Sequence, residues 1–231
     1  MSISNARLVK VVALLLIVMA MTKTDMEIYL AVLAWFSNFK AMDKTEIYIA
    51  RNIIIGNIGD SPTKYVLNYD KVSDAVITNN LLRILSFRHW SNFMLRLKKI
   101  LSENESIESA YLKLRGKIKG APHVVLSFML SGETGFPTSN SKCTFYTYYL
   151  YLYLLSKHRV WSQHTVKDAL IPCSSVVIKN ALSKGYLKKA KEPTLRVANE
   201  LTNVARAKYG NENFYKMYDE LNYEQRVYTK E

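Results

Sequence analysis

A chain of 231 residues, 49% of them apolar, can bury one large or two small hydrophobic cores, which excludes an intrinsically disordered protein. Its two cysteines exclude a disulfide framework and cannot form a tetrahedral zinc site by themselves. The formal net charge of +13 favours a partner of negative charge, either a phosphate backbone or an anionic lipid surface.

The positive charge lies in two blocks of the chain. Residues 82–120 hold nine basic and three acidic side chains, and residues 142–231 hold 15 and eight. Residues 1–81 are nearly balanced, with eight basic and seven acidic side chains. Lysines on solvated helix faces produce similar counts without any partner, so the charge must be considered together with motifs.

The amino terminus carries an uncharged apolar run, Val11–Met21, after the basic residues Arg7 and Lys10. The run is shorter than an ordinary membrane span of about 20 residues. It has the length of a signal-peptide core, although Met19 stands where a cleavage site needs a small residue. Residues 8–22 thus form a buried helix, a membrane anchor or an export segment. We expect the buried helix in a cytoplasmic protein, because a disulfide framework is lacking.

The first part of the chain has the pattern of a helical domain, which we place at residues 1–135. Dense apolar residues over Ile28–Phe36 predict a helix that is packed on most of its sides. Further helices are predicted from the capping residues Asp43, Ser73 and Ser91. A short strand or an extended connector is expected at Tyr65–Leu67.

A helix, a glycine-containing turn and a second helix are predicted between Ser106 and Gly132. The segment Leu112–Phe128 resembles a helix-hairpin-helix, in which turn amides bind a DNA phosphate and nearby lysines add charge. The resemblance implies that Lys117 and Lys119 lie beside such a phosphate.

The same segment departs from the repair enzymes of the helix-hairpin-helix family. Pro122 stands where a second turn glycine is expected, and His123 and Val124 stand where the glycosylases have a nucleophilic lysine. No aspartate occurs at positions 136–140 to complete a catalytic site. An active base-excision enzyme is therefore not expected.

A segment rich in turn formers, Gly132–Ser141, predicts a linker to a second domain at residues 141–231. Phe145–Leu155 is compatible with a β-run, since Tyr and Thr favour strands. We prefer a buried helix, because the basic turn after Leu155 complements a helix dipole. A short helix capped by Ser162 follows, and then a third helix, Ser174–Leu182, with Gly185 as its left-handed stop.

This order of elements resembles a winged helix-turn-helix. Gly185–Ala190 and Leu195–Ala198 would pair as a β-hairpin wing around Pro193. Leu201–Tyr209 looks like the Leu-Thr-x-x-Gly-Arg-x-x-Tyr ending of MarR-like and PadR-like proteins, with Ala205 in place of the glycine. The expected fold is mainly α, with an amino-terminal helical domain followed by a winged helix-turn-helix.

The resemblance implies that the third helix enters the major groove of DNA while the wing contacts the backbone. Asn180 has the chemistry for a bidentate contact to adenine, and Lys179 can reach guanine. The residues expected to contact DNA are Ser174, Ser175, Lys179 and Asn180 in the third helix, Lys188, Lys189, Lys191 and Arg196 in the wing, and Lys117 and Lys119 in the hairpin.

The leading hypothesis is a DNA-binding protein with double-stranded DNA as its partner, either a transcriptional regulator or an accessory factor of a DNA transaction. The last predicted helix, Asn213–Tyr228, would pair two subunits in a homodimer or pack on the amino-terminal domain. No cofactor, metal site or catalytic residue is expected, because no paired carboxylates, phosphate loop or metal cluster stands out.

Two other hypotheses stay open. One is a DNA repair protein related to the helix-hairpin-helix family that has changed its chemistry. The other is a membrane-associated adaptor anchored by residues 8–22.

Overall fold

The computed structural model describes residues 21–36, 56, 58, 59, 61–70, 87–130, 146–189 and 192–227. Within these ranges the chain forms helices and turns and contains no strand, which confirms the prediction of a mainly α-helical protein. Several predicted features lie outside the described residues: positions 8–20 of the apolar run, the helices from Asp43 and Ser73, the linker Gly132–Ser141, and Lys191. No helix in the described ranges is long and apolar enough to cross a membrane.

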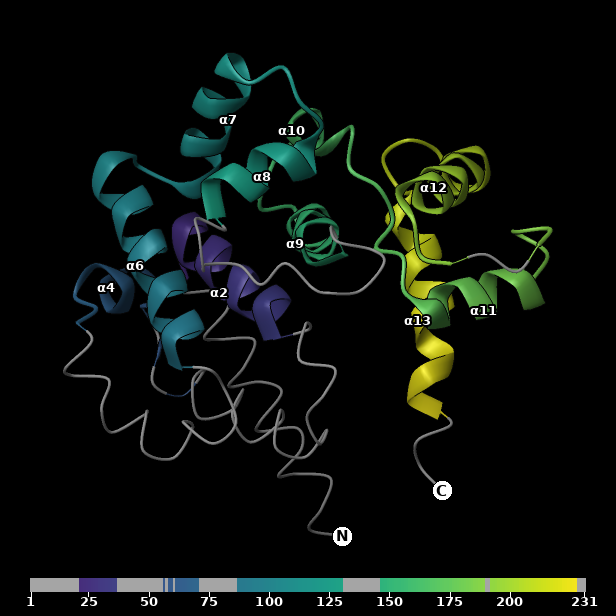
Figure 1. Ribbon diagram of the computed structural model, residues 1–231, viewed down its shortest axis with the longest axis horizontal. Helices are drawn as coiled ribbons and strands as arrows, with labels where there is room; N and C mark the ends of the chain where they lie inside the picture. The colour runs from purple at the N-terminus through teal and green to yellow at the C-terminus, as the bar shows by residue number, and fades with distance from the viewer. Residues whose placement is uncertain are drawn as a thin grey trace, which may run out of the picture.

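Helix α2 (Lys23–Phe36) is central to the amino-terminal part of the protein (Figure 1). Its side chains Ile28, Ala31 and Trp35 have no exposed surface, which confirms the prediction of a helix packed on most sides. Trp35 contacts Trp90 and Phe93, with ring centroids 5.2 and 5.9 Å apart. These aromatic contacts join α2 to α6.

The helices around α2 differ from the sequence predictions in two details. Tyr65–Leu67 belongs to helix α4 (Pro62–Leu67) and is not a strand, because Pro62 occupies the first turn, where a fixed φ favours a helix. Helix α6 (Phe87–Glu103) begins four residues before Ser91. Ser91 therefore lies within the helix, with its side chain buried, and does not cap it. Helices α7 (Ile107–Lys117) and α8 (Pro122–Leu130) confirm the predicted helix, turn and helix.

Helix α9 (Tyr146–Lys157) lies between the two ends of the molecule and packs against α2, α8 and α13 (Tyr215–Val227). Its tyrosines 148, 149, 151 and 153 are buried, so the prediction of a buried helix is confirmed. The hydroxyl of Tyr151 donates a 3.0 Å hydrogen bond to the backbone oxygen of Glu27 in α2. Helix α9 was expected to open a separate carboxy-terminal domain; its contacts include α2 of the amino-terminal helices, and the division into two domains stays a prediction.

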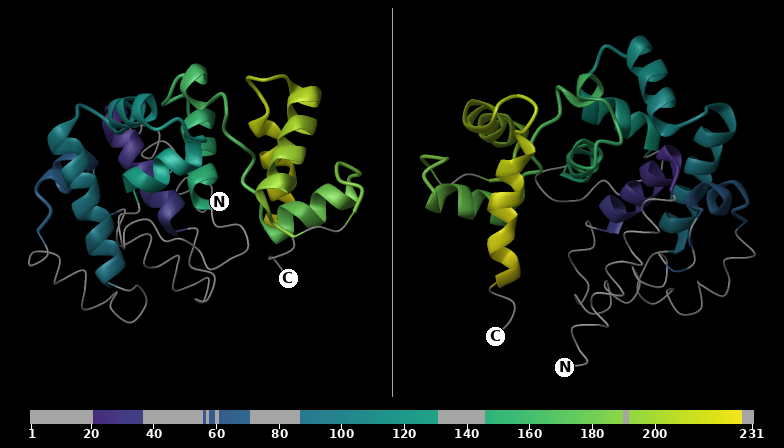
Figure 2. Two further views of the ribbon diagram at one scale, coloured as in Figure 1. Left: turned by 45° about the horizontal axis from the view of Figure 1, so that its top comes forward. Right: turned by 180° about the vertical axis from the view of Figure 1, so that it is seen from behind.

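Helices α11 (Ser175–Ser183), α12 (Leu195–Tyr209) and α13 group together at the end of the molecule opposite α4 and α6 (Figures 1 and 2). We call these three helices and their connections the carboxy-terminal lobe. Helix α13 contacts both α11 and α12. Four side chains of the last helical segment are buried against the protein's own chain, namely Phe214, Met217, Tyr218 and Leu221.

The prediction of a β-hairpin wing is wrong. Leu195–Ala198 forms the first turn of α12, and residues 185–189 turn without pairing. Thr194 caps α12, since its Oγ1 accepts a 3.3 Å hydrogen bond from the amide of Val197. Apolar residues at helical spacing from Val197 to Ala205 are buried along one face, and this longer pattern determines the local structure. Gly185 does terminate α11 as predicted, at φ +73°.

Candidate nucleic-acid interface

Helix α11 presents one polar face and one buried face. The Oγ of Ser174 caps the helix by accepting a 3.2 Å hydrogen bond from the amide of Val177. Val177 and Ile178 are buried, whereas Ser175 and Lys179, one helical turn apart, are exposed on the same face. The structure therefore places Ser175 and Lys179 where a partner can contact them.

Asn180 occupies a different position from the one that the resemblance implied. Its side chain is half-buried, and its Nδ2 donates a 2.6 Å hydrogen bond to the backbone oxygen of Leu221 in α13. This bond fastens α11 to α13. A bidentate contact from Asn180 to adenine would first require the bond to break.

The carboxy-terminal lobe has exposed cations that form no ion pair or hydrogen bond with any residue that the structure describes, among them Lys179, Lys188, Lys189 and Arg196. Lys179 lies on α11, Lys188 and Lys189 lie in the turn that follows it, and Arg196 lies in the first turn of α12. They come from one stretch of the chain and share one lobe. Their positive charges are available to an anionic partner.

Two other cations of the same lobe, Lys208 and Lys184, have structural partners. Lys208 and Lys184 lie 3.2 and 3.7 Å from carboxylate oxygens of Glu220. Tyr186 also donates to Glu220 over 2.8 Å. Burial acts to raise the pKa of Glu220, but hydrogen bonds from Tyr209, Tyr186 and Lys208 together lower it to about 2.

Two residues of the Leu201–Tyr209 segment hold the chain that leads into α11. The guanidinium of Arg206 donates to the backbone oxygens of Lys167 and Ala169 over 2.6 and 3.2 Å. The hydroxyl of buried Thr202 accepts a 2.8 Å hydrogen bond from the amide of Ile171. These bonds give the segment a role in holding the chain that leads into α11.

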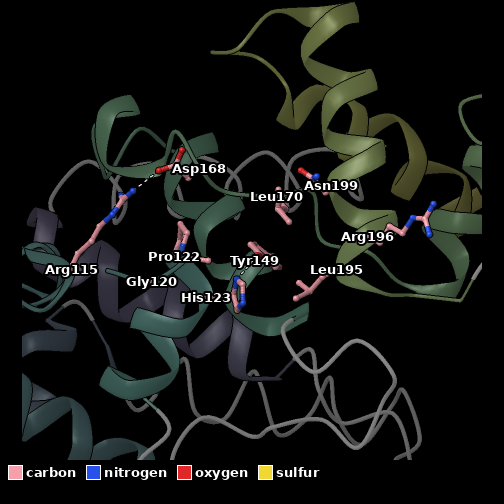
Figure 3. Close-up of a pocket in the computed structure, with 11 residues that line it drawn as sticks. Arg115, Gly120, Pro122, His123, Tyr149, Asp168, Leu170, Leu195, Arg196 and Asn199 are labelled. Carbon is pink, nitrogen blue, oxygen red and sulfur yellow. Dashed lines mark hydrogen bonds and ion pairs between the residues drawn. The ribbon is translucent and has the colours of Figure 1, made fainter. Parts of the chain in front are cut away.

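The second predicted basic site is the connection between α7 and α8. Lys117 ends α7, Lys119 lies in the turn after it, and both side chains are exposed. Neither one pairs with a described acidic residue. Gly120, which follows directly, lines a cleft between α8 and α12 (Figure 3).

This cleft has a volume of about 560 Å³ and is lined by residues from five segments of the chain: Arg115, Gly120, Ala121, Pro122, His123, Tyr149, Asp168, Leu170, Leu195, Arg196 and Asn199. At one end, Arg115 forms an ion pair with Asp168. Deeper in, His123 Nδ1 is hydrogen-bonded to the hydroxyl of Tyr149. Burial lowers the pKa of His123, which favours the neutral imidazole.

The cleft joins the two basic blocks of the sequence. One wall of the cleft begins at Gly120, the residue after Lys119, and the other wall includes Arg196. Sequence reasoning missed the other polar lining residues Arg115, His123, Asp168 and Asn199, because their spacing along the chain carries no motif. Helix packing alone brings them together.

No group of three or more His, Cys, Asp or Glu side chains in the described ranges is arranged to hold a metal ion. No protein-family model, curated protein or solved structure matches this sequence.

Proposed function

We propose that the protein binds double-stranded DNA through its carboxy-terminal lobe, as a transcriptional regulator or an accessory factor of a DNA transaction. The observation that carries this proposal is the set of exposed cations without a partner among the described residues, Lys179, Lys188, Lys189 and Arg196. Each cation that meets a phosphate releases counterions, and this release supplies affinity that depends on salt and not on sequence.

Helix α11 is the element best suited to approach the bases. Its nine residues span about 14 Å at 1.5 Å per residue, and Ser175 and Lys179 share its exposed face. Its buried face is held by Val177, Ile178 and the Asn180 bond to Leu221, so the helix has a fixed orientation. Because there is no wing, the turn that carries Lys188 and Lys189 contacts the DNA backbone instead.

Lys117 and Lys119 form a second, smaller basic surface. Lys119 directly precedes Gly120, which lines the cleft beside α8, whereas Arg196 lines it from α12. A nucleic-acid strand that follows the cleft would meet cations from both sides. This arrangement favours one continuous binding surface over two separate ones.

The proposal is tested by titrating the full chain with duplex DNA at several salt concentrations. The variant Lys188→Ala/Lys189→Ala should bind every duplex more weakly, and its salt slope should fall by about two, at roughly 0.9 per lost phosphate contact. The matched control is Lys64→Ala/Lys99→Ala, which removes two exposed lysines from α4 and α6 at the opposite end of the molecule.

The control separates a specific surface from a general effect of net charge. An unchanged salt slope in the control supports the proposal. Equal losses in both double variants would show that the lysines only add to the overall charge of the protein, and the proposal would then be wrong.

A further inference from the structure

The cleft between α8 and α12 differs in chemistry between its interior and its rim. Figure 3 shows Leu195 directed towards the rings of His123 and Tyr149, with Leu170 and Asn199 nearby. Arg196 lies at the edge, and its guanidinium is directed away from those rings. The interior thus offers the aliphatic carbon of Leu195 over two largely buried rings, with one amide nearby, while the guanidinium of Arg196 lies outside.

The charges of the side chains that line the cleft determine whether a charged or a neutral group fits there. Arg115, which lines the end of the cleft away from Arg196, is already paired with Asp168. A phosphate inside would therefore meet a carboxylate without a spare cation beside it. A neutral, planar group fits the interior better, and a phosphate fits the rim, where Arg196 has no partner among the described residues.

Size and hydrogen bonding agree with this division. A volume of about 560 Å³ lies within the range of about 300–1,000 Å³ that is typical of small-ligand sites. The side chain of Asn199 is exposed and bonds to no described residue. Its amide carries both donors and an acceptor, which is the pairing that a base edge requires.

We propose that this cleft binds an unpaired nucleotide of a nucleic-acid strand, with the base in the interior and its phosphate at the rim. The base packs against Leu195 above the largely buried rings of His123 and Tyr149, its edge bonds to Asn199, and its phosphate meets Arg196. This inference rests on the proposed function, because the strand must first be held by the carboxy-terminal lobe.

The test compares two duplexes that differ by one nucleotide. One is fully paired, and the other carries a single bulged 2-aminopurine, whose fluorescence changes when the base is transferred into a binding site. The full-length protein should bind the bulged duplex about tenfold more tightly, which corresponds to about 1.4 kcal/mol and lies in the lower part of the range of about 1–3 kcal/mol that stacking on a ring contributes per base.

A matched pair of variants on α12 assigns the effect to the cleft. Asn199→Leu removes the amide that lines the cleft, and Asn203→Leu makes the same change one helical turn further on, outside the lining. Both positions are exposed, so both variants should fold. We expect Asn199→Leu to reduce the preference for the bulge to less than twofold while paired-duplex affinity stays the same, and Asn203→Leu to retain the preference.

The outcomes separate this inference from the proposed function. Equal affinity of the unaltered protein for both duplexes overturns the inference and leaves DNA binding intact, whereas binding to neither duplex overturns both. A bulge preference that survives Asn199→Leu also overturns it. Adenosine monophosphate at micromolar concentration serves as a competitor: if it displaces the 2-aminopurine, the cleft takes free nucleotides and the assignment to a strand is wrong.

Discussion

The indole N–H of Trp161 donates a 2.6 Å hydrogen bond to Oε1 of Glu27, although the two residues are 134 positions apart. The same carboxylate accepts hydrogen bonds from the amides of Ile107 and Glu108 at 2.8 and 3.0 Å. Glu27 has no exposed surface. One buried carboxylate therefore joins α2, the amino terminus of α7 and the chain that follows α9.

Replacing this carboxylate should destabilise the whole protein. In Glu27→Gln the amide NH₂ faces N–H donors, so at least one buried donor loses its acceptor, at a cost of about 1–3 kcal/mol each. We expect the free energy of unfolding, measured by urea denaturation, to fall by about 3 kcal/mol. Glu103→Gln, at an exposed position at the end of α6, should change it little. Similar values for both variants would contradict the role assigned to Glu27.

Asn180→Ala should act on stability rather than on the choice of DNA sequence. The variant removes the hydrogen bond to Leu221, which contributes about 1 kcal/mol, and should lower the melting temperature. Affinity for a selected site and for random duplex should then change equally. Asn203→Ala, an exposed position on α12, provides the control. A loss of affinity confined to the selected site would show that Asn180 breaks its hydrogen bond to Leu221 and contacts a base.

The stability of the carboxy-terminal lobe should depend on acid through Glu220. Its pKa is about 2 in the folded protein against an ordinary 4.5, so the unfolded chain binds the proton more tightly. The contribution is fully present above about pH 4.5 and is lost as the pH falls towards 2. Between pH 5.5 and 3, the urea midpoint of Glu220→Gln should fall less than that of the unaltered protein. Glu212→Gln, an exposed carboxyl, should behave like the unaltered protein.

A fragment of residues 141–231 should be only partly folded. Helix α9 would lose α2, and Tyr151 and Trp161 would lose their bonds to Glu27. We expect amide hydrogen exchange to be fast in α9 and slow in α11–α13, whose contacts lie within the fragment. Slow exchange throughout α9 would instead support the separate carboxy-terminal domain that the linker predicts.

Local patterns predicted much of the secondary structure. Ser162, Ser174 and Gly185 mark helix boundaries in the sequence and in the structure, because capping depends on neighbouring backbone atoms. Leu195–Ala198 was misassigned as a strand, since four residues do not distinguish a strand from the first turn of a longer helix. Contact with DNA stays a prediction for the candidate residues of this lobe. Five of them are exposed, as such contact requires, namely Ser175, Lys179, Lys188, Lys189 and Arg196, whereas Ser174 is half-buried.

The sequence by itself determined the helical class, the caps at Ser162 and Ser174 and the two basic blocks, because these properties depend on residue type and on spacings within a few turns. The tertiary structure decided which cations form ion pairs within the protein, such as Lys208 with Glu220, and which are exposed without a described partner, such as Lys188. It also brought Gly120 and Asn199 to one cleft and enclosed Glu27 between three distant segments. Such contacts join residues that are far apart along the chain, and only the packing of the helices determines which of them meet.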